Sequence, residues 1–128
     1  MATIVGGVRT SLADSVTLST SQTGNGQSTN VADRSGSNGS ALLTIVSTVG
    51  ATPTVTVAIE GSAEGADWFP VAYADAATPE TVTVATFAIT TATTTRKILR
   101  PFHPWRFLRL TYSANTNVTL TANLYVFH

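Results

Sequence analysis

The sequence contains no cysteine, and few of its side chains carry a charge. Without cysteine the chain has no thiolate metal ligand, no cysteine nucleophile and no disulfide. Seven basic and seven acidic residues among 128 give a formal net charge of zero, which provides no long-range attraction for nucleic acid or anionic lipid. A chain of this length is long enough to bury a core without disulfides, so we expect one domain.

Long hydrophobic segments are also missing. Apolar residues come in short groups such as Ala41–Leu43, whereas a membrane-spanning helix needs roughly 20 of them in succession. The first residues, MATIVGGVRTSLADS, lack a basic start followed by a long apolar stretch, so we expect no secretory signal. The absence of cysteine also fits synthesis in a reducing cytosol.

Threonine is the commonest residue, with 24 copies, and the sequence also has 13 valines and 11 serines. Thr and Val are branched at Cβ, which restricts χ1 and suits a pleated sheet better than a helix. Apolar and polar residues alternate most regularly over residues 53–60 and 117–127, and no segment has the 3.6-residue period of a helix. The pattern predicts an all-β fold, an antiparallel β-sandwich of seven or eight short strands. The expected core residues are Val55, Val57, Ile59, Leu108, Leu110, Leu120, Leu124 and Val126.

Glycine, proline and asparagine mark where we expect the strands to end or to become irregular. Pro70 lacks an amide hydrogen, which restricts its strand to an edge or a bulge. The expected irregularities are a hairpin at 50–53 between strands 41–49 and 53–60, an edge or bulge at Pro70, a bulge near Ala85, and a turn at Asn115 and Asn117 between strands 106–112 and 117–127.

The N-terminal third has a different composition from the rest. Eighteen of the 22 residues from 19 to 40 are Ser, Thr, Gly, Asn or Gln, so this segment has little apolar surface to offset the entropy of ordering it. We expect a long flexible loop at 19–40 within a single sandwich domain that spans 14–128. Residues 1–13 form either a flexible N-terminal arm or a further strand; in the arm, Ile4, Val5 and Val8 would contact a partner.

Few side chains are placed for catalysis. The histidines are His103, between Phe102 and Pro104, and the terminal His128, and neither lies in a nucleophile motif. Glu60 and Glu64 flank a turn, where solvated acids are common. The acids lack the spacing of metal ligands, and no glycine-rich segment resembles a phosphate loop. We therefore predict no enzyme, no metal and no cofactor.

A basic and aromatic cluster remains. Five of the seven basic residues, Arg96, Lys97, Arg100, Arg106 and Arg109, lie among Phe102, Trp105 and Phe107. One interpretation is a surface for single-stranded nucleic acid, with bases stacked on the aromatic rings. The favoured interpretation is an ordinary strand whose Arg side chains pair with neighbouring acids. A third is contact with an acidic protein surface; its candidate residues are Arg96, Lys97, Arg100 and Trp105.

Four segments together resemble small virion structural proteins of tailed bacteriophages. They are DRSGSNGSALLTIVSTVG, PTVTVAIEGSAEGADWFPV, RPFHPWRFLRLTY and NVTLTANLYV, which together cover roughly residues 33–127. The resemblance implies a non-enzymatic capsid decoration (cement) or head-fibre protein located in the virion. Its partners would be the major capsid protein and copies of itself, as trimers or dimers. The family has no catalytic residues to transfer to this sequence.

Two other functions stay open from the sequence. A carbohydrate-binding β-sandwich would stack sugar rings on aromatic faces, and a virion could use such a module to contact host glycans. The aromatic candidates are Trp68, Trp105, Tyr73, Tyr112 and Tyr125. A single-strand nucleic-acid binder depends on the 96–109 cluster alone, and the zero net charge argues against it.

Overall fold

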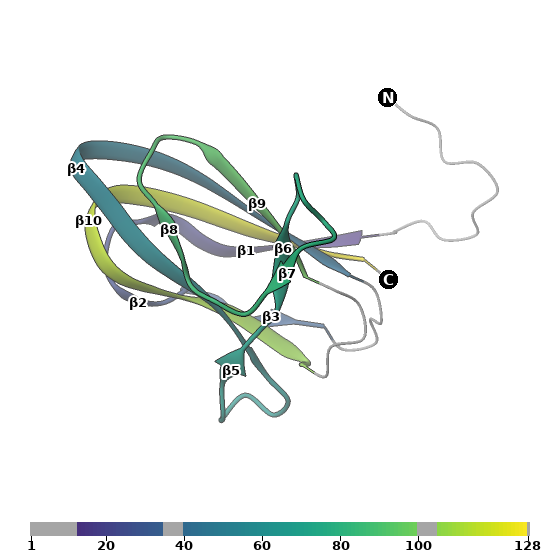
Figure 1. Cartoon of the computed structure of the whole chain (residues 1–128). Helices are drawn as coiled ribbons and strands as arrows, with labels where there is room; N and C mark the ends of the chain where they lie inside the picture. The colour runs from purple at the N-terminus through teal and green to yellow at the C-terminus, as the bar shows by residue number, and fades with distance from the viewer. Residues whose placement is uncertain (1–12, 35–39, 100–104, 128) are drawn as a thin grey trace.

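The computed structural model describes residues 13–34, 40–99 and 105–127, and every regular element in them is a β-strand. The strands pack in two layers around one core (Figure 1). This confirms the predicted all-β, antiparallel sandwich class. The strands are β1 (Ala13–Gln22), β2 (Gly26–Gln27), β3 (Ala32–Asp33), β4 (Ala41–Ser62), β5 (Phe69–Pro70), β6 (Tyr73–Asp75), β7 (Val82–Thr83), β8 (Phe87–Ile89), β9 (Thr94–Leu99) and β10 (Phe107–Phe127).

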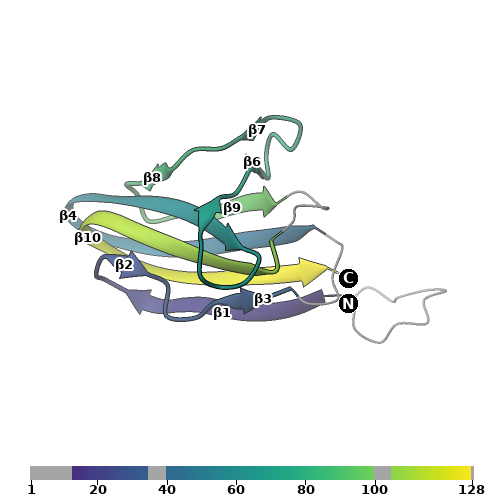
Figure 2. The same cartoon turned by 90° about the horizontal axis from the view of Figure 1, so that it is seen from below.

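Two long strands, β4 and β10, form the centre of the fold. They pair antiparallel from Ser62 opposite Phe107 to Ala41 opposite Val126, and the register shifts between Ser113 and Val118. Both strands bend at this irregularity and turn back, so each contributes one half to each layer (Figures 1 and 2). One layer has the order β1-β10-β4-β9-β6-β7, and in the other layer β2, β3, β5 and β8 pair with the remaining halves.

The bends correct two of the expected turns. Residues 41–49 and 53–60 are not a hairpin but the two halves of β4, and Asn115 and Asn117 lie in a bend within β10. The physical reason is that β10 supplies hydrogen-bond partners to both halves of β4, so the halves do not need to pair with each other. A local link with Gly and Pro fits a bend as well as a hairpin.

The alternating side chains point as the sequence predicts. Outside the bends, odd-numbered residues of β4 and even-numbered residues of β10 are buried on the inner faces of the two layers. All eight predicted core residues are at most 4% exposed. Burial of this apolar surface, at about 25 cal/mol per Å², is the main force that holds the layers together.

The polar segment 19–40 is not a long loop in its described part. Residues 19–22 continue β1, while β2 and β3 pair with β10. Backbone hydrogen bonds from Ser28 to Leu110, at 2.7 Å, and from Arg34 to Arg106, at 2.7 Å, hold it in place. Hydrogen bonds to β10 compensate for the small apolar surface. Residues 1–12 and 35–39 lie outside the described residues, and Ala13 is the first residue of β1.

The segment 69–89 closes one side of the sandwich. β5 and β8 extend the layer that contains the second half of β4, whereas β6 pairs with β9 in the other layer. Pro70 lies in an edge strand, as predicted. The bulge expected near Ala85 is instead a link between two separate strands, because β7 pairs with β6 whereas β8 pairs with β4 in the other layer. Within the described residues, no helix could cross a lipid bilayer.

Candidate interaction surfaces

The two ends of the sandwich differ in charge. We call the end where β1 begins and β10 begins and ends the base, and the opposite end, where β4 and β10 bend, the tip (Figure 1). The tip consists of residues 21–26, 48–54 and 113–119, and none of them is charged. The base carries Asp33, Arg34, Glu60, Glu64, Asp67, Arg106 and Arg109.

A stacked pair of aromatic rings lies at the base. The rings of Phe69 and Trp105 are 5.2 Å apart and nearly parallel, with an interplanar angle of 14°. Trp105 packs against the core, whereas Phe69 is 48% exposed. The indole lies directly over Gly61, where an added Cβ would be only 2.4 Å from the Trp105 Cγ atom. Gly61 thus provides the space in which Trp105 supports an exposed phenyl ring.

The arginines of β10 and the residue before it pair with acids, as the favoured interpretation of the basic cluster predicts. Arg109 donates from Nε to Glu60 at 3.0 Å, and its guanidinium carbon lies 4.0 Å from the centre of the Trp68 ring. Arg106 forms two hydrogen bonds with Asp33, each 3.1 Å. Hydrogen bonding to Asp33, together with the negative charge of Asp33, raises the pKa of Arg106. Leu108 and Leu110 in the same strand are buried. This part of the cluster is an ordinary strand.

The basic cluster does not form one surface. Arg96 and Lys97 lie in β9, which pairs with the first half of β4. Arg109 in β10 and the preceding Arg106 lie beside the second half of β4, in the other layer. Arg96 is exposed. Lys97 is only 9% exposed, forms an ion pair with Asp75, and lies over the rings of two aromatic residues, so it is placed to hold the fold rather than to contact a partner. The other predicted contact residues, Ile4, Val5, Val8 and Arg100, lie outside the described residues.

Most of the aromatic candidates for sugar stacking are covered. Tyr73 and Tyr112 are 4% and 1% exposed, and burial raises the pKa of both phenols. Phe69 covers Trp105, and Arg109 covers one face of Trp68. Tyr125, which is 37% exposed, lies on the outer face of its layer.

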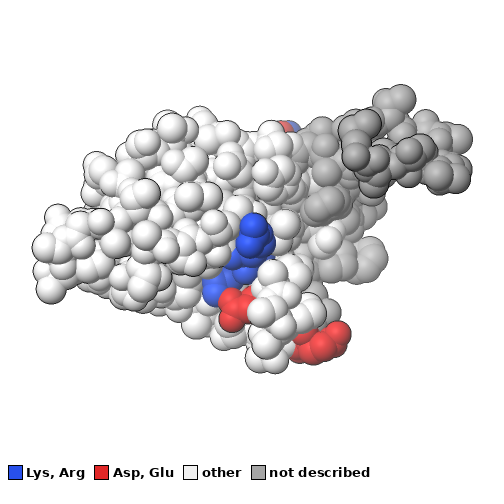
Figure 3. Space-filling model, turned by 90° about the horizontal axis from the view of Figure 1, so that it is seen from above, with Lys and Arg blue, Asp and Glu red and all other residues white. Residues whose placement is uncertain are grey.

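The outer face of the β1-β10-β4-β9 layer is rich in threonine. The strand register places Thr17, Asn123 and Thr44 side by side across three strands, with Val46 and Thr121 in the next row. Figure 3 shows a broad expanse without charge on this side of the molecule, with most of the visible basic and acidic side chains gathered over one part of it. Apart from Arg96, which lies opposite Thr44 in β9, this face offers hydroxyl and methyl groups.

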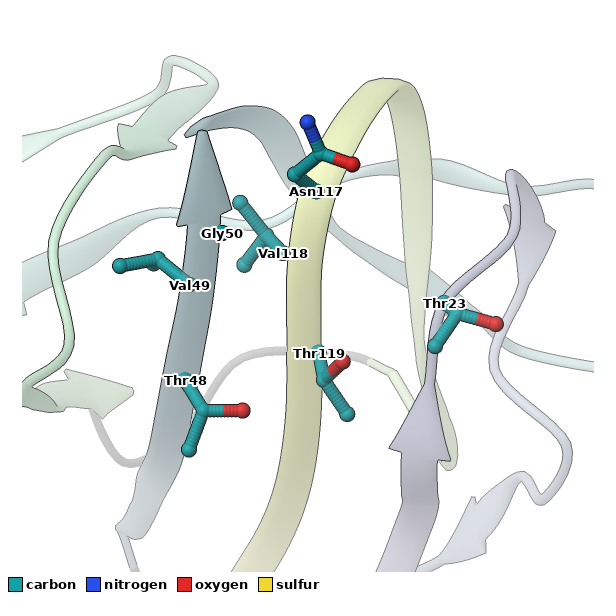
Figure 4. Close-up of a pocket in the computed structure, with 7 residues that line it drawn as sticks. All are labelled: Thr23, Thr48, Val49, Gly50, Asn117, Val118 and Thr119. Atoms are coloured by element: carbon teal, nitrogen blue, oxygen red, sulfur yellow. The ribbon is translucent and has the colours of Figure 1, made fainter. Parts of the chain in front are cut away.

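A hollow of about 420 Å³ opens at the tip, where this face meets the bends (Figure 4). Thr48 of β4 and Thr119 of β10 lie opposite each other in the register, with Asn117 at the bend beside them and Thr23 on the far side of β10. The remaining lining residues are Val49, Gly50 and Val118. Sequence reasoning missed this site because its residues come from three distant segments.

The bends around the hollow contain residues with positive φ, and side-chain hydrogen bonds hold them in place. Ser21, Thr52, Ala114 and Asn117 all have φ between 44° and 54°, the left-handed region that non-glycine residues rarely adopt. Asn117 Nδ2 donates to the Ala51 carbonyl at 2.6 Å. Asn115 likewise exchanges two hydrogen bonds with the backbone of Val118. Three of the four strained residues belong to the β4 and β10 bends.

The described acids Glu60 and Glu64 are engaged by neighbouring groups. Glu60 accepts hydrogen bonds from Arg109 and Thr111, and Glu64 accepts one from the Asp67 amide at 2.9 Å. His103 and His128 lie outside the described residues. In residues 13–34, 40–99 and 105–127, no three His, Cys, Asp or Glu side chains come together as metal ligands.

Comparison with known proteins yields a fold similarity only. No family model matches the sequence, and the search of curated proteins found no match. Among solved structures, the SPBc2 prophage-derived protein YomS has the same fold, with a TM-score of 0.65 and 10% sequence identity over 95% of this chain and 100% of that chain. At this identity the similarity establishes the fold and transfers no residue roles.

Proposed function

We propose that this protein is a non-enzymatic structural protein of a phage virion, made in the bacterial cytoplasm, that binds the outer surface of the capsid as a decoration (cement) or head-fibre component. The observation that carries the proposal is the exposed Phe69 ring held on Trp105 at the base. Aromatic side chains that are rigid before binding lose little entropy on contact and dominate protein interfaces. The fold shared with a prophage-derived protein supports the phage origin.

The base is also the end from which residues 1–12 lead into β1. In this proposal those residues, with Ile4, Val5 and Val8, lie along a neighbouring capsid subunit and add backbone hydrogen bonds there. The tip then points away from the shell. Copies on a shell surface would be arranged around its symmetry axes, as trimers or dimers.

A matched pair of substitutions tests the contact. Phe69→Asp places a charge in the proposed interface, whereas Val84→Asp places one at a residue of the β7–β8 link that is 60% exposed. We expect Phe69→Asp to reduce the copies per purified virion about tenfold or more, because an interface anchor of this kind contributes roughly 2 kcal/mol. Val84→Asp should leave the copy number unchanged.

Both variants must first be shown to fold. Circular dichroism and thermal denaturation of both variants separate a lost contact from a lost fold. Equal occupancy of the two folded variants would contradict the role of Phe69, and absence of the wild-type protein from purified virions would contradict the whole proposal. A variant without residues 1–12 should fold normally and occupy fewer sites if these residues contact the shell.

A further inference from the structure

The tip hollow has the chemistry of a binding site for a neutral, hydroxyl-rich molecule, and we propose that it binds a sugar ring. The inference goes beyond capsid binding and does not depend on it. The hollow, at about 420 Å³, lies within the roughly 300–1,000 Å³ range of small-molecule sites. Its lining contains three threonines, one asparagine, a glycine and two valines.

The polar groups of the hollow are available to form hydrogen bonds with a ligand. The hydroxyls of Thr23, Thr48 and Thr119 make no hydrogen bond to another residue in the described part of the chain. By contrast, the amide group of Asn117 donates to Ala51, which leaves its Oδ1 atom as an acceptor. A threonine hydroxyl both donates and accepts, and these are the two functions that a sugar hydroxyl requires of its partner.

The absence of charge selects the ligand class. None of the residues in 21–26, 48–54 and 113–119 is acidic, basic or aromatic. A protein partner would usually contact aromatic or arginine anchors, and a phosphate or carboxylate would require a cation. Neutral hydroxyls beside the methyl groups of Val49 match a ring that has hydroxyls at its rim and C–H groups on its face.

The backbone holds this shape before any ligand arrives. Thr52 and Ala114 have positive φ, at a cost of about 1 kcal/mol or more each, whereas Asn117 adopts this region more readily. The hydrogen bonds of Asn115 and Asn117 maintain the two bends. A pocket that is already ordered does not spend binding energy on ordering its loops, which matters for a small, weakly binding ligand.

The size of the hollow and the number of its polar groups predict weak binding. A ligand of one ring with a few hydrogen bonds should have a Kd on the order of 1–10 mM. The experiment is a titration of the ¹⁵N-labelled full chain with methyl α-glucoside, methyl β-galactoside and N-acetylglucosamine, each to about 50 mM. We expect at least one sugar to shift the amide signals of residues 48–50 and 117–119 in a saturable way.

Two double variants make the test specific. Thr48→Val with Thr119→Val keeps the shape of the hollow but removes two hydroxyls, and should weaken binding about tenfold. Thr44→Val with Thr56→Val makes the same chemical change on β4 outside the hollow, and should not alter binding. The proposal is overturned if none of the three sugars shifts these signals, or if both double variants bind as the wild type does. Virion occupancy is measured separately, so failure here leaves the capsid proposal unaffected.

Discussion

The ammonium group of Lys97 lies 4.6 Å from the centre of the Phe87 ring, and the two residues belong to opposite layers of the sandwich. The same ammonium lies 5.2 Å from the centre of the Tyr73 ring and forms an ion pair with Asp75. The Tyr73 and Phe87 rings are also in edge contact, with centres 5.5 Å apart. This cluster fastens β8 to β6 and β9 at the side of the sandwich that residues 69–89 close.

Loss of the Lys97 contacts should lower the stability of the fold, whereas loss of the exposed Arg96 side chain on the same strand should have little effect. We expect Lys97→Ala to lower the free energy of unfolding by about 2–3 kcal/mol, because it removes a buried stem and the cation–aromatic contacts. Lys97→Met keeps the stem and should lose about half as much. Arg96→Ala, on the exposed face of the same strand, should change it by less than about 0.5 kcal/mol. Urea denaturation of the four proteins measures all three differences.

A second prediction concerns Gly61. Its replacement by alanine would place Cβ 2.4 Å from Cγ and 2.7 Å from Cβ of Trp105, so the root of the indole must move. We expect Gly61→Ala to lower the free energy of unfolding by about 2 kcal/mol or more and to change the tryptophan fluorescence. Gly24→Ala is the control, since the nearest atom to its added Cβ is 4.0 Å away.

The loss of stability caused by Gly61→Ala should depend on Trp105. In a Trp105→Ala background the same Gly61→Ala change should cost much less, because the clashing ring is gone. Equal costs in the two backgrounds would show that Gly61 serves the backbone and not the indole.

The alternation of apolar and polar residues along the sequence correctly predicted which strand residues are buried. Val55, Val57 and Ile59 repeat every second residue, and the structure buries all three. The same alternation groups Lys97 with the buried Leu99, a signal that the basic cluster obscured. The hairpin at 50–53 was wrong because a bend and a hairpin share the same local residues, and the choice between them depends on β10, about 60 residues later.

The candidate sites also depend on contacts between segments that are far apart in the sequence. The Phe69–Trp105 pair joins residues that are far apart in the sequence, and only the pairing of Gly61 with both Phe69 and Leu108 brings the two rings together. The tip hollow needs three segments to meet. Its composition was visible as runs of Ser, Thr, Asn and Gly, but such runs indicate loops in general and not a hollow.

The bend of β4 supplies a third prediction. Thr52 has a φ of 44°, where a residue branched at Cβ is strained, whereas asparagine tolerates this region better. We expect Thr52→Asn to raise the free energy of unfolding by about 0.5–1 kcal/mol. Thr54→Asn, in the second half of β4, should lower it slightly, because asparagine fits a strand less well than threonine does. A shift of both urea midpoints in the same direction would contradict the role of the backbone angle.

The last prediction concerns pH and rests on Tyr112, which is 1% exposed and donates a hydrogen bond to Ser19 Oγ at 2.9 Å. Burial raises the pKa of Tyr112 above its ordinary value of 10.0, and the hydrogen bond with Ser19 opposes this to a smaller extent. Because the folded pKa is the higher one, the contribution of the neutral phenol to stability is fully present below pH 10 and is lost as the pH rises through the folded pKa.

Tyr112→Phe removes the ionisable group and the hydrogen bond. We expect the variant to be about 1 kcal/mol less stable at pH 7, and to lose less stability than the wild type between about pH 9 and pH 11. Thermal denaturation at several pH values, with Tyr125→Phe as the exposed control, measures the difference. Parallel pH curves for wild type and Tyr112→Phe would show that this phenol does not limit alkaline stability.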